Sequence, residues 1–375
     1  MEKQKTKVLI VAGEDSGDNH AAKLVRAIRE EASGRGFEFF GSAGPKMRDA
    51  GVEAVVRADE LSIVGLAEIG KALPMFARTM RVLRAEADKR RPDVAILVDF
   101  PEFNLRLTKH LKKLGIRVVY YISPQLWAWR QYRISTIRKY VDLLITILPF
   151  EKDWYAERGV TNVEYVGSPL TKEVHASRTK EQFCADHALD PERPIIALLP
   201  GSRGKEITRI LPVMLETADR MPAVQFVLAV NKKPGHRATW LKNLSVAVNE
   251  TYDALNAANA AAIASGTATL EAGIIGTPMV VVYKTSKLNY TIFEPMIDVP
   301  HYGLINLIAG RRLCTELIQH EFTPEVVQAE LERLLDPKVN ATMRKELAEA
   351  ADKLGAGGAS KRAAQAIIKL IVQPL

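Results

Sequence analysis

Short apolar runs alternate with longer segments of helical periodicity along the whole chain. Val94–Val98 and Met279–Val282 are apolar at consecutive positions, as is typical of parallel strands covered by helices on both faces. The pattern predicts strands at residues 7–12, 37–41, 52–56, 94–99, 117–122, 143–148, 163–167, 195–200, 225–230, 244–248, 261–264 and 279–284. It favours an α/β fold of two doubly wound, Rossmann-like domains facing a cleft.

The length of the chain supports two domains. With 375 residues, of which 47% are hydrophobic, it exceeds what one ordinary core holds. The composition changes after Ser168, where prolines become frequent, and glycines at 355, 357 and 358 interrupt the last helical pattern. We therefore predict an N-terminal domain at residues 1–168, a C-terminal domain at 169–358, and a final helix within 359–375 that can pack back onto the first domain.

Charge and cysteine content narrow the functional classes. A net charge of +8 and an isoelectric point near 9.3 favour an anionic partner: nucleic acid, a phosphorylated substrate or an anionic membrane. Cys184 and Cys314 lack metal or disulfide spacing, which fits the reducing cytoplasm. The start of the chain leads directly into a strand pattern, and no long apolar window follows, so we expect neither a signal peptide nor a transmembrane helix.

A glycine-containing turn follows the strand pattern at 195–200 and carries Gly201, Ser202 and Arg203. Backbone N–H groups at the start of the following helix, together with a guanidinium, suit a diphosphate. The turn matches neither a Walker A motif nor G-x-G-x-x-G, which argues against an ATPase or a dinucleotide enzyme. The simpler alternative is an ordinary turn with a surface arginine.

A second loop of small and hydroxyl residues follows the strand pattern at 261–264. Its residues Ser265, Gly266, Thr267, Ala268 and Thr269 allow backbone N–H groups to approach a phosphate. Glu271 lies early in the next helix, where it can accept the hydroxyls of a ribose. Its alternative role is a favourable charge near a helix N-terminus.

Carboxylates follow two strand patterns of the first half. Glu14, Ser16 and His20 lie in the loop and helix start after the first strand, and Asp99 follows the fourth. Because partial desolvation raises a carboxyl pKa, Asp99 is the preferred general base, and Glu14 can orient a sugar hydroxyl. Helix capping or loop anchoring are the alternatives. No D-x-D pattern indicates a metal that would bridge phosphates.

Aromatic and basic residues gather after the fifth strand pattern, at Trp127, Trp129 and Arg130. Such a cluster can stack on nucleic acid. Since it is short and isolated, we interpret it instead as the wall and phosphate contacts of a substrate site.

Residues 61–78 are more apolar than a solvated helix, and arginines follow at 78, 81 and 84. This combination predicts a peripheral membrane anchor or a site for acyl chains, with an ordinary core helix as the alternative. The apolar candidates are Ile63, Val64, Leu66, Ile69, Leu73, Met75 and Phe76.

Taken together, seven segments resemble the lipid-A-disaccharide synthase family in order along the chain. They are Gly13–Asp18, Asp99–Asn104, Ser123–Arg130, Leu148–Glu151, Leu199–Arg203, Ser265–Glu271 and Asn306–Arg311. The resemblance implies an inverting GT-B glycosyltransferase that needs no metal. It implies transfer of 2,3-diacylglucosamine from UDP-2,3-diacylglucosamine to the 6-hydroxyl of 2,3-diacylglucosamine 1-phosphate, giving a β-1,6 disaccharide. The resemblance also implies that the protein is cytoplasmic and associates peripherally with the inner membrane. It implies no nucleic-acid partner.

By the same resemblance, Arg203, the 265–271 loop and Asn306 serve UDP, while Glu14 and Asp99 act near the sugars. Asp15, Phe100, Glu102 and the residues 302–305 depart from the family pattern and bear on acyl preference and fine geometry. Another GT-B sugar-nucleotide enzyme, such as a UDP-N-acetylglucosamine 2-epimerase, is the nearest alternative. A non-catalytic binder of nucleic acid or membrane would leave the carboxylates unexplained.

Overall fold

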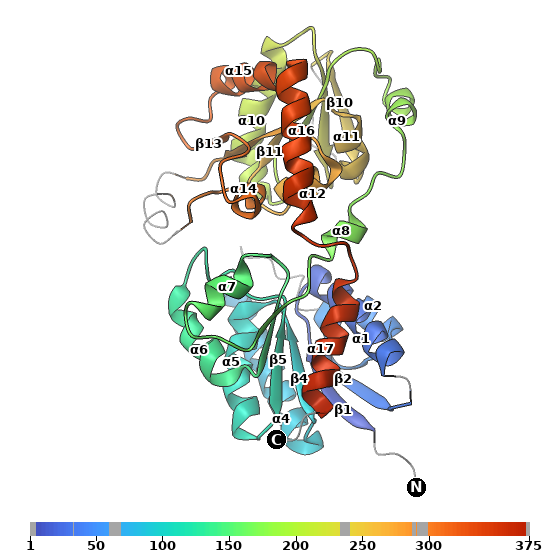
Figure 1. The fold of residues 1–375 in the computed structure, drawn as a ribbon, viewed down its shortest axis with the longest axis vertical. Coiled ribbons are helices and arrows are strands. Elements are labelled where there is room, and N and C mark those ends of the chain that lie inside the picture. Colours follow the sequence, from blue (N-terminus) through green and yellow to red (C-terminus); the bar gives the residue numbers. More distant parts are fainter. Residues whose placement is uncertain are drawn as a thin grey trace. The chain divides into compact units, whose positions relative to one another are not determined.

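The structure is a computed structural model that describes residues 5–32, 34–59, 69–232, 241–286, 290 and 299–372. It divides into two compact units (Figure 1). The first consists of Met1–Pro169 with Gly357–Leu375, and the second of Leu170–Ala356. The sequence placed these boundaries at 168/169 and 358/359.

The first unit is built on a seven-stranded, wholly parallel sheet of order β3-β2-β1-β4-β5-β6-β7. The strands are β1 (Thr6–Val11), β2 (Phe37–Ala43), β3 (Glu53–Arg57), β4 (Val94–Val98), β5 (Arg117–Tyr121), β6 (Leu143–Thr146) and β7 (Val163–Tyr165). The order reverses between β1 and β4, which are direct neighbours with Val11 beside Leu97. In such sheets the carboxyl ends at the reversal point form the crevice where ligands bind.

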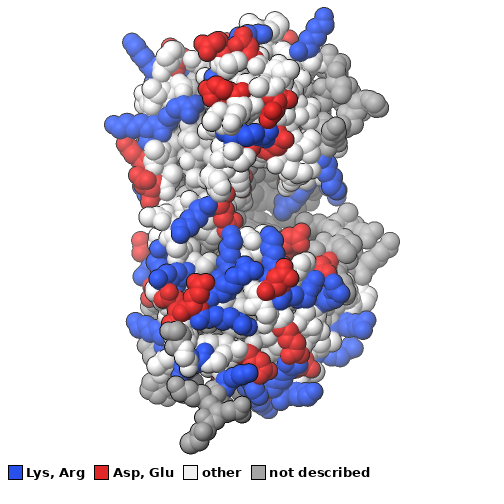
Figure 2. Space-filling model, turned by 90° about the vertical axis from the view of Figure 1, so that its right-hand side faces the viewer, with Lys and Arg blue, Asp and Glu red and all other residues white. Residues whose placement is uncertain are grey.

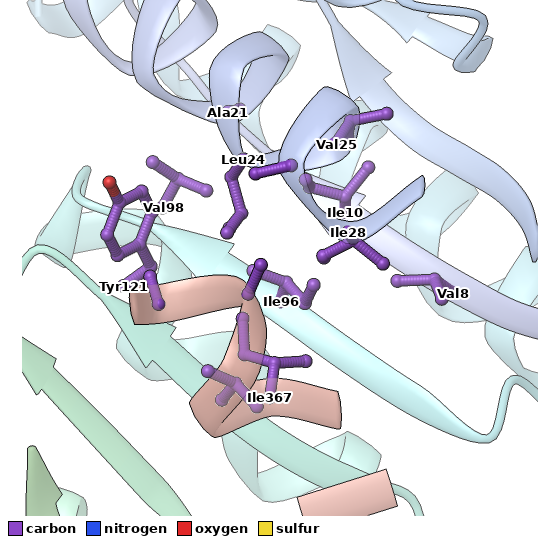
Figure 3. Close-up of a cluster of buried hydrophobic side chains, with 14 of the residues drawn as sticks. Val8, Ile10, Ala21, Leu24, Val25, Ile28, Ile96, Val98, Tyr121 and Ile367 are labelled. Atoms are coloured by element: carbon purple, nitrogen blue, oxygen red, sulfur yellow. The ribbon is translucent and has the colours of Figure 1, made fainter. Parts of the chain in front are cut away.

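Helices cover both faces of this sheet. They are α1 (Asp15–Glu31), α2 (Pro45–Asp49), α4 (Ile69–Arg90), α5 (Pro101–Lys113), the 3₁₀ turn η2 (Gln131–Arg133), α6 (Ile134–Tyr140), α7 (Glu151–Ala156) and α17 (Ala359–Val372). Because side chains alternate along a strand, Ile10 and Ile96 pack with α1 and α17, while Leu9 and Leu97 pack on the other face. Figure 3 shows the first of these clusters, with Ile367 of α17 closing it.

The second unit repeats the scheme with a six-stranded parallel sheet of order β10-β9-β8-β11-β12-β13. Its strands are β8 (Ile195–Leu199), β9 (Gln225–Val230), β10 (Leu244–Val248), β11 (Ala260–Ala264), β12 (Met279–Tyr283) and β13 (Glu316–Ile318). Its helices are α8 (Leu170–Glu173), α9 (Lys180–Asp186), α10 (Gly204–Arg220), α11 (Thr251–Ala257), α12 (Ala268–Ile275), α14 (Leu304–Ala309), α15 (Pro324–Leu335) and α16 (Pro337–Asp352). Here the order reverses between β8 and β11, the strands that precede the two phosphate-type loops.

The predicted fold class is confirmed, and each predicted strand segment is a strand. The sequence analysis did not predict β13, because this strand has only three residues and begins with a charged glutamate, so it forms no apolar run. In the structure the Glu316 carboxylate is buried and accepts the backbone N–H groups of Tyr302 and Gly303. A charged residue therefore takes an interior place on an edge strand.

Within the described residues, no helix combines the length and the apolar character that a membrane span needs. Of the apolar candidates, Ile63, Val64 and Leu66 lie outside the described residues, and Ile69 and Leu73 lie in the first turns of α4, where only the backbone is described.

Candidate active site

Asp99 sits directly after β4 on an unusual stretch of backbone. Asp99 and Phe100 have φ values of 45° and 50°, the left-handed region that non-glycine residues rarely adopt. Two buried side chains hold this conformation: the Asp99 carbonyl oxygen accepts bonds from Tyr120 Oη at 2.6 Å and from Asn104 Nδ2 at 2.8 Å. Strained backbone that its surroundings fix in this way is frequent at functional sites.

The Asp99 carboxyl group has a pKa of about 6, well above that of an ordinary aspartate. Burial is the main cause, since it disfavours the charged form, and the negative charge of Glu14 adds to it. A hydrogen bond from the Phe100 backbone acts in the opposite direction. The result is a carboxylate that is ionised at neutral pH and yet basic enough to accept a proton.

The loop after β1 packs directly on the loop after β4. A Cβ atom at Gly13 would lie 2.4 Å from the Phe100 ring, so only glycine fits beneath that ring as it stands. Glu14 follows, exposed at the start of α1. Ser16 is also exposed, and His20 is half-buried one turn further along α1. The loops thus bring Glu14 close enough for its charge to act on Asp99.

The third acid of the first loop, Asp18, has a structural role. It is buried, and its carboxylate accepts the backbone N–H groups of Gly44, Lys46 and Met47 at 2.9–3.1 Å. These groups belong to the start of α2, so Asp18 fastens that helix to α1.

The aromatic and basic loop after β5 divides between interior and surface. Trp127 is buried, and its indole Nε1 donates to Glu151 at 3.1 Å. Trp129 is 41% exposed, and the Arg130 guanidinium lies 4.2 Å from the centre of its ring. Of the three predicted acceptor residues in this loop, Trp129 and Arg130 reach the surface.

Glu151 holds the loop after β5 in place through hydrogen bonds in the interior. It is fully buried, and besides Trp127 it accepts bonds from Ser123 Oγ at 2.7 Å and from the Leu148 backbone at 3.1 Å. Burial raises its pKa to about 7, against the effect of these donors. Sequence reasoning gave Glu151 no role, because a fully buried glutamate has no sequence signature.

An aromatic cluster joins α4 to the Asp99 loop. The rings of Phe76, Phe100 and Phe103 pack with centroids 5.6–6.3 Å apart. Phe76 and Met75 are half-buried. Apolar surface therefore lies next to the candidate base.

The second unit contains an open pocket of about 680 Å³ at the carboxyl ends of its strands. Eight predicted nucleotide-site residues line it: Gly201, Ser202, Arg203, Ser265, Gly266, Thr267, Ala268 and Glu271. Gly201 and Gly266 have φ values of 99° and 148°, which require glycine. The N-termini of α10 and α12 follow these two loops, so their free N–H groups and positive dipole ends lie at the pocket.

Charged groups at the pocket suit a nucleotide. Arg203 is 71% exposed and lies 3.4 Å from Glu206, an interaction that an anion can replace at little cost. Glu271 is hydrogen-bonded to Tyr252 Oη at 3.3 Å. Burial raises the pKa of Glu271 and brings that of Tyr252 to about 12.

Two residues predicted to contact UDP are instead buried. Asn306 uses both ends of its amide on Cys314 and donates to Glu316 Oε1 at 2.8 Å. Thr269 donates to the Gly266 carbonyl within its own helix start. Asn306 is connected to the pocket through hydrogen bonds, since Glu316 holds the turn at Tyr302, whose carbonyl accepts Ser265 Oγ at 2.6 Å.

The pocket also includes residues to which the sequence reasoning assigned no individual role. They are His175, Ser177, Leu199, Glu206, Ala229, Val230, Asn231, Asn249, Glu250, Thr251, Tyr252, Asp253 and Ala264. Asn231 and Asn249 follow β9 and β10, so the rule that ligands bind at the carboxyl ends of strands could have found them. His175 comes from the segment after α8, for which the sequence offers no signal. In the described part of the chain, no group of three or more His, Cys, Asp or Glu side chains is placed to hold a metal ion.

We expect Asp99→Asn to stabilise the first unit at neutral pH. The raised pKa means that ionising Asp99 disfavours the folded state, by about 3 kcal/mol for a shift from 3.8 to about 6. Below pH 4 the group is protonated in both states and the effect vanishes; it grows as the pH rises and is complete above about pH 6. Urea unfolding at pH 5 and pH 8 should therefore show a larger gain at pH 8.

Asp15→Asn is the matched control, because Asp15 is exposed in the first turn of the neighbouring helix α1. It should change stability by less than about 0.5 kcal/mol at either pH. An equal gain for Asp99→Asn at pH 5 and pH 8 would contradict the assignment.

Comparison with known proteins identifies the family. A family model described as lipid-A-disaccharide synthetase matches residues 8–370. A relative named lipid-A-disaccharide synthase, from Trichlorobacter lovleyi, is 41% identical over 378 residues and covers 98% of each chain.

Solved structures show the fold. A putative UDP-N-acetylglucosamine 2-epimerase from Listeria monocytogenes superposes with a TM-score of 0.67 at 15% identity, covering 98% of this chain and 97% of its own. The glycosyltransferase of kitacinnamycin gives a TM-score of 0.65 at 14% identity, covering 99% and 100%. Since one fold accommodates both epimerases and transferases, the family match decides between them. The chain belongs to the lipid-A-disaccharide synthase family of GT-B glycosyltransferases.

Proposed function

We propose that this glycosyltransferase uses Asp99 as the general base of a single inverting displacement. The acceptor is 2,3-diacylglucosamine 1-phosphate, and its 6-hydroxyl attacks the anomeric carbon of UDP-2,3-diacylglucosamine. As the new C–O bond forms, the bond to UDP breaks and the hydroxyl proton passes to Asp99. The observation that carries the proposal is the Asp99 pKa of about 6 on a backbone fixed by Tyr120 and Asn104.

Glu14 has a distinct part in this proposal. Its negative charge helps to raise the pKa of Asp99, so it strengthens the base. Its exposed position after β1 also leaves its carboxylate available to a sugar hydroxyl. Ser16 and His20 belong to the same helix start and are proposed to contact the acceptor.

The second unit is proposed to bind the donor. The N-termini of α10 and α12 and Arg203 would hold the diphosphate, and Glu271 would accept the ribose hydroxyls. With these groups opposite the leaving UDP, its negative charge can be stabilised without a metal ion. We propose that no metal or other cofactor takes part. Thr269 and Asn306 then support the site from the interior.

The charge distribution supports membrane contact by the first unit. Residues 1–169 and 357–375 carry 31 Lys and Arg against 22 Asp and Glu, whereas 170–356 carry 21 against 22. Figure 2 shows Lys and Arg gathered over the lower, first unit. We propose that this unit binds the anionic cytoplasmic surface of the inner membrane, with exposed Arg78 and Arg81 of α4 among the contacts.

Acceptor-dependent release of UDP tests the reaction. With UDP-2,3-diacylglucosamine alone we expect little UDP; adding 2,3-diacylglucosamine 1-phosphate should start release, and mass spectrometry should identify a tetra-acylated disaccharide phosphate. EDTA should leave the rate unchanged. UDP-sugar conversion without an acceptor would instead favour an epimerase and overturn the proposal.

The pH profile tests the base. For the wild-type protein kcat/KM should rise with pH and level off above about pH 6, where Asp99 is ionised. Asp99→Asn should lower kcat by about 10²- to 10⁴-fold. Glu14→Gln removes a negative charge that raises the Asp99 pKa, so the rising limb should move to lower pH. A limb that stays in place in Glu14→Gln would show that the two carboxyls are not coupled.

Membrane contact can be measured by co-sedimentation with vesicles. Binding should require anionic lipid and weaken between 0.05 and 0.5 M salt, roughly as screening shortens the range of charge interactions. Arg78→Glu with Arg81→Glu should reduce it further. Equal binding to neutral and anionic vesicles would contradict the electrostatic account.

A further inference from the structure

Two arginines of the first unit converge on one carboxylate beside the candidate base. Arg133 Nη2 lies 2.7 Å from Glu102 Oε2, and Arg130 Nη1 is bonded to Glu102 Oε1. Each carboxylate oxygen is thus held by a different guanidinium. The Glu102 side chain is 50% exposed, whereas those of Arg130 and Arg133 are 31% and 15% exposed. The cations are therefore the fixed partners, and the carboxylate is the more accessible one.

The two guanidinium groups are held in place from outside the ion pair. Arg130 packs on the Trp129 ring, and Arg133 lies 5.8 Å from the Tyr132 ring centre. The loop that carries them is anchored by buried Glu151 through Ser123 and Trp127. Such preorganisation lowers the entropic cost of binding an anion.

The cluster adjoins the proposed reaction centre. Glu102 lies in the first turn of α5, three residues after Asp99 in the chain. The charges of Asp99, Arg133 and Glu102 all act on the Tyr120 hydroxyl, which itself binds the Asp99 carbonyl. Asp99 and the cluster therefore lie within the electrostatic surroundings of this one hydroxyl, in the same group of loops.

The chemistry of this pair matches a group that the acceptor carries. Two converging guanidinium groups are suited to bidentate binding of a phosphate. A phosphomonoester has a charge of about −1.5 to −2 at pH 7, against −1 for a glutamate, so it can compete for both cations. Between binding events the glutamate would offset their mutual repulsion.

We propose that Arg130 and Arg133 form the subsite for the phosphomonoester of the acceptor, and that Glu102 occupies this subsite until the phosphate displaces it. The inference rests on the proposed function, since it takes the sugar 1-phosphate as the acceptor. It adds a specificity mechanism: an acceptor without phosphate cannot displace Glu102 and loses two charge-assisted contacts.

The test compares 2,3-diacylglucosamine 1-phosphate with unphosphorylated 2,3-diacylglucosamine at saturating donor. In the wild-type protein the phosphorylated acceptor should have the higher kcat/KM, on the order of 100-fold. Arg133→Ala and Arg130→Gln should each reduce this ratio at least about tenfold, with the donor KM unchanged. Glu102→Gln should lower the KM of the phosphorylated acceptor several-fold, because its competitor is gone.

Arg138→Ala is the matched control, since it removes an exposed arginine from the adjoining helix α6. In this variant, the ratio of kcat/KM for the phosphorylated acceptor to kcat/KM for the unphosphorylated one should equal that of the wild-type protein. If both Arg130→Gln and Arg133→Ala keep the wild-type ratio while folded, as judged by circular dichroism, the subsite is refuted. If these variants lost vesicle binding but kept the wild-type kcat/KM ratio, the two arginines would instead be assigned to binding membrane phospholipid, and the acceptor subsite would be refuted.

Calorimetric titration of both lipids in detergent micelles separates this inference from the proposed function. A wild-type protein without turnover, but with a binding preference for the phosphorylated lipid that Arg133→Ala abolishes, would refute the reaction and retain the subsite. Turnover with equal binding of the two lipids would retain the reaction and refute the subsite.

Discussion

The left-handed backbone at Asp99 and Phe100 is the constraint on which the first unit's site depends. A parallel strand would ordinarily pass into its helix without two such residues in succession, and their conformation survives because Tyr120 and Asn104 both bond the Asp99 carbonyl. The turn they create puts the Asp99 carboxyl in a partly desolvated place and puts the Phe100 ring over Gly13. The raised pKa of Asp99, the nearness of Glu14 and the start of α5 all depend on this one fixed turn.

Both units place their candidate site residues at the same point of the sheet topology. In each, the strand order reverses next to the first strand of the unit, and the loops after the two central strands carry the candidate residues. The loops differ in chemistry. Those of the first unit present carboxylates and aromatic rings, whereas those of the second present glycines, hydroxyls and helix N-termini. The same fold therefore carries a candidate proton acceptor in one unit and a candidate anion site in the other.

The sequence was informative where function depends on local pattern. Apolar runs located the strands, and glycine-containing loops after β8 and β11 located most of the pocket. The sequence was uninformative where contacts between distant parts of the chain determine whether a side chain is buried. Nothing local distinguishes Trp127, whose indole is buried on Glu151, from exposed Trp129 two residues later. The polar side chain of Asn306 likewise suggests a ligand contact in the sequence, whereas in the structure its amide is hydrogen-bonded to Cys314 and Glu316.

The ring over Gly13 links two positions that are far apart in the chain. A methyl group at position 13 would overlap the Phe100 ring, so Gly13→Ala requires the ring or the loop to move. If a smaller side chain replaced Phe100 first, the space beneath it would open. The two positions are thus coupled, and the order in which substitutions arise decides which sequences are accessible to the two loops around Asp99.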